Sequence, residues 1–287
     1  MKVWHDYDQA ALDAQYDTRA QIGDRYDAFS AERSRASLAA RERLSPRLDV
    51  AYGAGPRQRL DIFPPPAGAS AAPIAVFVHG GFWRAGDKSN FSYLADGLHS
   101  LGAAAVIVGY PLCPAASLDE VVGSVRSALC WIVARAHEFG GDAQRLWLFG
   151  HSAGAHLVAM CCCANGAEGE WSPPSIEGAV MLSGMYDLDP LRLCYINAEI
   201  RLDAAQVARL SPVRLRAMVA GPMIIAVGDE ETAEFHRQAS EFAAAMAAQR
   251  VRAEFVVVPS ANHYTVVRQL VARESPLLAR FQAMLSA

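Results

Sequence analysis

The chain has 287 residues, of which 52% are hydrophobic and 20% charged, and its formal net charge is −4. This composition is too apolar for a disordered chain, and a chain of this length buries about three quarters of its unfolded surface without a disulfide or metal. The slight excess of acid argues against nucleic acid and anionic membranes as partners, because phosphate surfaces attract basic proteins. We therefore expect a small-molecule substrate.

The N-terminal segment MKVWHDYDQAALD carries acids where a signal peptide has an apolar core, and no apolar run approaches the ~18 residues of a membrane span. We expect a cytoplasmic protein without membrane association. The oligomeric state stays open, with a homodimer among the alternatives. The six cysteines lack CxxC spacing and are expected to be reduced packing residues. They are Cys113, Cys130, Cys161, Cys162, Cys163 and Cys194.

Residues 1–45 are expected to form an amphipathic leader that is rich in charged residues. The runs 48–52 and 57–63 alternate apolar and polar residues, which predicts an antiparallel hairpin at a sheet edge. Further along, short apolar β-branched runs alternate with helical patterns, as in a mostly parallel sheet of about eight strands with helices on both faces. The strands expected to be buried on both faces are 74–79, 104–109, 145–150, 178–183, 223–228 and 254–258.

Helices are predicted over 118–139, 153–164 and 231–249, the first ending at a Gly-Gly pair typical of a C-cap. Residues 186–220 interrupt the alternation of strands and helices. Because sites in α/β sheets lie beyond the carboxyl ends of the strands, we expect the leader and this insertion to fold over the site as a lid. The whole chain, 1–287, is expected to form one α/β domain.

The segment Gly150-His151-Ser152-Ala153-Gly154 reads GxSxG between the predicted strand RLWLF and a predicted helix. That strand-turn-helix context is the one in which the serine is an exposed nucleophile, because small residues permit the sharp turn. Ser152 is therefore the predicted nucleophile.

The strand IAVFVH runs into Gly80-Gly81-Phe82-Trp83, where glycines let backbone amides approach a developing oxyanion. We predict an oxyanion hole formed by the amides of Gly81, Phe82 and Ala153. Trp83 belongs either to the core or to a pocket wall, and we assign it to substrate binding. His79, at the strand end, is expected to anchor this loop.

In folds with this strand-turn-helix motif, the three catalytic residues follow one another along the chain in the order serine, acid, histidine. His263 follows the last predicted strand and is the expected general base, whereas His151 is too close to Ser152 in sequence to turn its ring onto it. For the acid we choose Glu231, three residues beyond the glycine that closes strand 223–228. Asp229 is the main alternative, with Glu230 and Asp187 behind it.

The segments HGGFW, GHSAGAHL, GDEETAEFHRQ and NHY together resemble the kynurenine formamidase (arylformamidase) branch of the α/β-hydrolase superfamily, close to hormone-sensitive-lipase-type esterases. The resemblance spans nearly the whole chain, and HGGxW is its most discriminating piece. It implies an α/β-hydrolase fold with Ser152 as nucleophile, His263 as base and an acid at Glu231, where animal members more often have aspartate.

The resemblance implies a serine hydrolase that converts N-formylkynurenine to kynurenine and formate through an acyl-enzyme, with no metal or organic cofactor. A carboxylesterase for short acyl esters needs the same machinery, and a non-catalytic binding protein is a third reading. The sequence does not select the residues that recognise the rest of the substrate. Those considered are Trp4, Tyr7, Tyr16 and Arg19 in the leader and Tyr186, Asp187, Tyr195 and Asn197 in the insertion.

Overall fold

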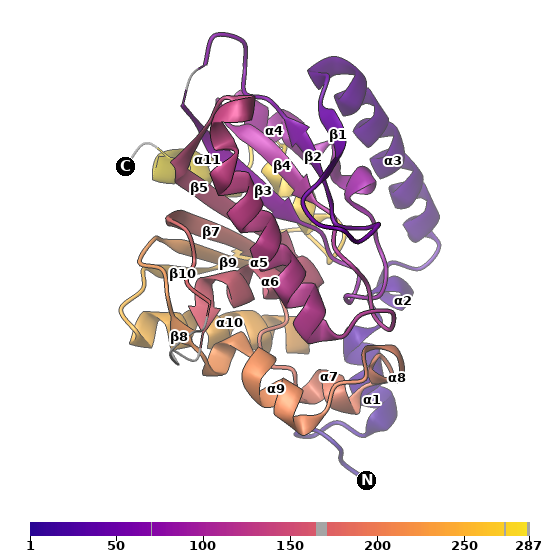
Figure 1. Cartoon of the computed structure of the whole chain (residues 1–287). Coiled ribbons are helices and arrows are strands. Elements are labelled where there is room, and N and C mark those ends of the chain that lie inside the picture. The colour runs from indigo at the N-terminus through magenta and orange to yellow at the C-terminus, as the bar shows by residue number, and fades with distance from the viewer. Residues whose placement is uncertain (70, 165–170, 273, 286–287) are drawn as a thin grey trace.

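A computed structural model describes residues 1–69, 71–164, 171–272 and 274–285. Its centre is one eight-stranded sheet in which every neighbouring pair is parallel except the two at the β1 edge (Figure 1). In spatial order the strands are β1 (Arg47–Ala51), β2 (Arg59–Phe63), β4 (Ala104–Val108), β3 (Ala72–Val78), β5 (Gly141–His151), β7 (Ile176–Leu182), β9 (Met223–Gly228) and β10 (Ala253–Val258). The predicted mostly parallel sheet and its antiparallel edge hairpin are confirmed.

Helices cover both faces of the sheet, because strand side chains alternate between the faces. On β3, Val76 and Val78 enter one core and Phe77 enters the other. The first core lies under α5 (Leu118–Ala134), α6 (Ala153–Cys162) and α10 (Ala233–Ala248). The second lies under α4 (Leu94–Ser100), the 3-10 helix Val266–Leu270 and α11 (Pro276–Leu285).

The strand at the far edge differs from expectation. Phe255 and Val257 of β10 are 39% and 43% exposed, so the prediction of burial on both faces is wrong for this strand. The reason is its position: among the described residues, β10 is the last strand of the sheet and has only β9 beside it. The five other strands of that prediction are buried over most of their length.

The predicted helix 118–139 is divided. Ser117 and Glu120 form a capping box at the start of α5, which ends at Ala134. A 3-10 helix, Ala136–Phe139, completes the segment, and Gly140 closes it with a left-handed φ of +80°. The predicted helix 231–249 begins two residues late, at Ala233.

The leader folds into α1 (Gln9–Tyr16), α2 (Thr18–Ile22) and α3 (Arg25–Leu44). The insertion supplies α7 (Asp189–Leu193), α8 (Asn197–Ile200), α9 (Ala204–Leu210), the 3-10 helix Pro212–Arg214 and β8 (Arg216–Ala217), which pairs with β6 (Cys163–Ala164). The two segments lie side by side (Figure 1), and the Gln9 side-chain amide donates to the Leu193 carbonyl at 2.9 Å. One more 3-10 helix, Lys88–Phe91, precedes α4.

Five of the six cysteines are buried free thiols, as predicted, and Cys130 on α5 differs because it is exposed. In the described part of the chain every helix is too short or too polar to cross a bilayer.

Candidate active site

Ser152 lies at the sharp turn between β5 and α6, with a left-handed φ of +56°. The turn requires the glycines on either side of it. A Cβ on Gly154 would stand 2.0 Å from the Val78 carbonyl oxygen, and one on Gly150 would stand 2.4 Å from the Gly154 carbonyl oxygen. The GxSxG spacing is therefore the packing requirement of this elbow, which holds the serine beyond the carboxyl end of its strand.

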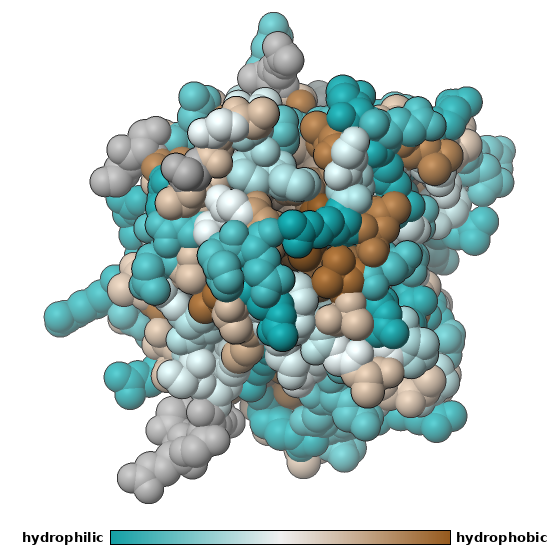
Figure 2. Space-filling model, turned by 45° about the horizontal axis from the view of Figure 1, so that its top comes forward, coloured by the Kyte–Doolittle hydropathy of each residue, from teal (hydrophilic) through white to brown (hydrophobic). Residues whose placement is uncertain are grey.

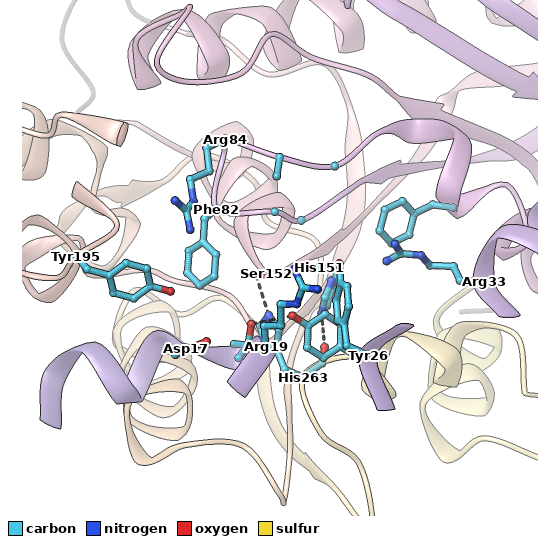
Figure 3. A pocket seen from close by; sticks show the side chains of 17 residues that line it. Asp17, Arg19, Tyr26, Arg33, Phe82, Arg84, His151, Ser152, Tyr195 and His263 are labelled. Carbon is cyan, nitrogen blue, oxygen red and sulfur yellow. Dashed lines mark hydrogen bonds between the residues drawn. The ribbon is translucent and has the colours of Figure 1, made fainter. Parts of the chain in front are cut away.

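Three predicted residues from separate loops meet here. The Ser152 hydroxyl lies 3.0 Å from Nε2 of His263, and Nδ1 of His263 lies 2.7 Å from a Glu231 carboxylate oxygen (Figure 3 draws the first contact). When Nδ1–H donates to Glu231, the lone pair on Nε2 accepts the serine proton. This is the arrangement of a nucleophile, a general base and an acid that orients the base.

Further donors hold the Glu231 carboxylate in place. Its other oxygen accepts hydrogen bonds from the Ser183 hydroxyl (2.5 Å) and the Gly228 amide (2.8 Å). Ser183 stands just after β7, where the sequence shows only a strand end, so no local motif predicts this role. The buried carboxylate is fully supplied with donors and is fixed in one orientation.

The other acids lie elsewhere. An oxygen of Asp229 accepts from the Ala261 amide at 3.1 Å, which braces the loop that carries His263. Glu230 is exposed, and Asp187 is paired with Arg214 at 2.9 Å.

The predicted oxyanion amides lie at the same end of the sheet. Gly81 has a φ of +123° and Phe82 a φ of +48°, and no acceptor among the described residues is hydrogen-bonded to either amide. Ala153 is the first residue of α6, so its N–H has no partner within the helix. These are backbone donors still available to a developing negative charge.

Trp83 does not line the pocket, contrary to its assignment to substrate binding. Its side chain is fully buried, and its indole N–H donates to Nδ1 of His156 at 3.2 Å. Phe82 and Trp83 both have left-handed backbone angles, and Phe82 is the one of the two that lines the pocket.

Two further histidines are buried beside the site. Nδ1 of His79 donates to the Gly80 carbonyl at 2.8 Å and its ring stacks on Tyr110, while burial lowers the pKa of His79 to about 4. Nε2 of His151 donates to the backbone carbonyl of His263 at 2.7 Å, and burial, with the nearby His263 ring, holds the pKa of His151 well below its usual value. His151 thus contacts the backbone of His263, the predicted base, and the position of His151 next to Ser152 in the sequence does not indicate this contact.

A pocket of about 280 Å³ opens over Ser152 and His263. The leader contributes Asp17, Thr18, Arg19, Tyr26 and Arg33 to its wall, and the insertion contributes Tyr195 (Figure 3). The remaining lining residues are Gly80, Gly81, Phe82, Arg84, Ala85, Gly86, Phe91, His151 and Tyr264. Hydrophilic side chains cover most of the face shown in Figure 2, and the apolar ones gather around a hollow near its centre.

Of the recognition residues that the sequence left open, only Arg19 and Tyr195 line this pocket. The others make structural contacts. Trp4 lies against Arg237 and forms a bridge with Tyr7, Tyr16 donates to Glu234, Tyr186 stacks on Phe242, Asp187 pairs with Arg214, and Asn197 bonds the backbone of Leu202.

Comparison with known proteins identifies the family to which the chain belongs. The family model BD-FAE matches residues 60–246. The kynurenine formamidase of Danio rerio is 31% identical over 229 residues, which cover 78% of this chain and 76% of that protein. The chain belongs to the kynurenine formamidase branch of the α/β-hydrolase superfamily. A second member of the branch, from Salmo salar, is 30% identical over 234 residues, with the same two coverages.

Other proteins similar to this chain are named as esterases. A probable isoprenylcysteine methylesterase of Arabidopsis thaliana is 32% identical over 149 residues, 50% of this chain and 31% of that protein. A crystal structure from Silicibacter sp. TM1040, provisionally described as a thioesterase, has a TM-score of 0.82 and 31% identity and covers 96% of this chain and 99% of its own. A Pyrobaculum calidifontis esterase shares the fold, with a TM-score of 0.68, 16% identity and coverages of 92% and 93%. The chain is a hydrolase with the α/β-hydrolase fold.

Proposed function

We propose that this protein hydrolyses N-formyl arylamides, with N-formylkynurenine giving kynurenine and formate. The observation that carries the proposal is the likeness to kynurenine formamidases over more than three quarters of the chain, together with the Ser152–His263–Glu231 contacts. The pocket of about 280 Å³ lies at the small end of small-molecule sites, which suits a compact acyl donor.

The reaction begins when Nε2 of His263 takes the Ser152 proton as the hydroxyl oxygen attacks the formyl carbon. Glu231 holds the imidazole in the reactive tautomer and stabilises the imidazolium that forms. The amides of Gly81, Phe82 and Ala153 stabilise the oxyanion, each contributing about 3–4 kcal/mol in comparable sites.

The tetrahedral intermediate then collapses. His263 gives its proton to the arylamine nitrogen, the C–N bond breaks, and the formyl group stays as an ester on Ser152. Water attacks this ester as His263 takes one of its protons. The imidazolium returns that proton to the Ser152 oxygen as the C–O bond breaks, and formic acid leaves and ionises to formate.

Hydrolysis of short acyl esters is the second candidate, because a probable methylesterase is similar to half of this chain in sequence and an esterase structure shares its fold. Comparing kcat/KM for N-formylkynurenine with that for p-nitrophenyl acetate separates the two. We expect the formamide to be preferred, and a strong preference for the ester would replace the formamidase proposal.

Catalysis itself is tested on Ser152. We expect Ser152→Ala to abolish turnover and labelling by a fluorophosphonate while leaving the melting temperature nearly unchanged. An unlabelled wild-type protein would favour a non-catalytic binding role, and a collapsed melting temperature would indicate a structural serine.

A further inference from the structure

The charged side chains around the pocket are mostly cationic. Arg19, Arg33 and Arg84 line it, and Asp17 is the one carboxylate among the described lining residues. Asp17 already caps α2 by accepting from the Ala20 amide at 3.0 Å. The pocket therefore presents an excess of positive charge to a ligand.

Two of these arginines have acidic partners. Arg84 forms an ion pair with Glu199 and lies over the Tyr195 ring. Arg19, with a side chain 70% exposed, lies 3.7 Å from Asp27. Their charges are partly neutralised before any ligand arrives.

Arg33 on α3 differs from both. Its guanidinium carbon lies 5.0 Å from the centre of the Phe91 ring and 5.8 Å from that of Phe29. None of the ion pairs among the described residues includes Arg33, and its buried Nε lacks a hydrogen-bond acceptor there. The adjacent Glu32 pairs with Arg268 at 2.7 Å. A guanidinium held against aromatic faces keeps its edge free for a planar anion.

Figure 3 shows the Arg33 side chain running from α3 toward the middle of the pocket, on the side opposite Tyr195. A buried N–H without an acceptor, such as Nε of Arg33, costs the folded protein free energy unless a ligand supplies an acceptor. A carboxylate is the ligand group that fits best, since it accepts two parallel N–H bonds from one guanidinium.

We propose that Arg33 binds a carboxylate of the substrate and makes the enzyme selective for arylamides that carry a carboxylate over those that lack one. This inference rests on the proposed formamidase function, in which the amino-acid end of N-formylkynurenine supplies the carboxylate. Arg33 is thus a specificity-determining residue that is remote from the reacting carbonyl.

The test compares N-formylkynurenine with its decarboxylated analogue, N-formylkynuramine, which differs only in the anion. In Arg33→Met, kcat/KM for N-formylkynurenine should fall about 10- to 100-fold more than for the analogue, mostly through KM. Arg33→Lys should retain part of the preference for N-formylkynurenine, because lysine keeps the positive charge but lacks the two parallel N–H donors of the guanidinium. Arg35 is an exposed arginine on the same helix, so Arg35→Met is the matched control. It should leave kcat/KM unchanged for both substrates.

Equal losses on both substrates in Arg33→Met, or an equal effect of Arg35→Met, would overturn the proposal. If the wild-type protein hydrolyses neither formamide, the formamidase function fails, and 3-acetoxybenzoate with phenyl acetate becomes the matched pair. A selective loss on 3-acetoxybenzoate in Arg33→Met would then preserve the anion site, and no selectivity would reject it. If Arg33→Met lowers the melting temperature enough to prevent assay, Arg33→Lys and Arg33→Gln are judged by the same ratio.

Discussion

The indole N–H of Trp83 donates to Nδ1 of His156 at 3.2 Å, which joins the loop of the predicted oxyanion hole to helix α6. The other ring nitrogen of His156 donates to the Leu210 carbonyl at 2.8 Å, within the insertion. Burial lowers the pKa of His156 to about 4, so the ring is neutral and Nδ1 keeps the lone pair that Trp83 needs. The Trp of HGGFW and the second His of GHSAGAH are therefore two halves of one contact.

Trp83→Phe tests this contact. The substitution keeps an aromatic ring but leaves Nδ1 of His156 buried without a donor, which should cost about 1–3 kcal/mol of unfolding free energy. Phe82, whose amide belongs to the predicted oxyanion hole, is held in a left-handed conformation next to Trp83. A shift of this amide would weaken stabilisation of the oxyanion, so we also expect kcat to fall about tenfold with little change in KM. Urea denaturation and steady-state kinetics measure the two effects.

The control is Trp131→Phe on α5, a half-buried tryptophan outside the site. If both variants lose the same activity, Trp83 is only a packing residue.

The choice between Glu231 and Asp229 is testable by paired amide substitutions. Glu231→Gln removes the charge that orients and stabilises the His263 ring, so kcat should fall about 10³- to 10⁴-fold. Asp229→Asn weakens one bond to the Ala261 amide and should cost less than tenfold. Kinetics at one pH suffice, and the reverse order of losses would make Asp229 the orienting acid.

The sequence predicts the parts of the site that depend on local geometry. Ser152 stands in a motif in which Gly150 is required by its close contact with Gly154, four residues away. His263 follows a strand that the sequence shows clearly as an apolar run. Both therefore lie at the carboxyl ends of strands, where the structure brings them together.

Other features depend on contacts that no local pattern records. The assignment of Trp83 to substrate binding is wrong, because its side chain is fully buried and Phe82 lines the pocket instead, a difference that the sequence of two adjacent aromatic residues does not record. Arg33 stands on a helix rich in arginine, and only its tertiary neighbours distinguish it from Arg35. The exposure of Phe255 follows from the order of strands in the sheet.

Asp61 on β2 is predicted to be the residue that secures the leader to the sheet. Its side chain is fully buried and accepts from Arg41 of α3 (3.0 Å), from Lys88 (2.5 Å) and from the Asp49 amide (3.0 Å). Asp61→Asn keeps the shape but removes the counter-charge of Arg41 and one of the two carboxylates that pair with Lys88, which also contacts Asp49 at 2.7 Å. Unfolding free energy should fall by about 3–5 kcal/mol, as measured by urea denaturation.

Glu254→Gln is the matched control for Asp61→Asn, because Glu254 pairs with Arg280 at the exposed surface (2.9 Å). Its effect should stay below about 1 kcal/mol. Similar losses in the two variants would show that the Asp61 cluster is no more important than a surface pair.

Acid should destabilise the protein through its buried histidines. The pKa values of His79 and His156 are lowered from 6.5 to about 4 by burial, so between these pH values the unfolded chain binds protons that the folded chain does not. Stability is therefore complete above pH 6.5 and falls as the pH drops toward 4, by about 2 kcal/mol for each histidine between pH 7.5 and pH 5. In urea denaturation over that range, His156→Gln should lose about 2 kcal/mol less than the wild-type protein, because glutamine does not titrate. Parallel pH curves for the two proteins would show that His156 is protonated equally in the folded and unfolded states.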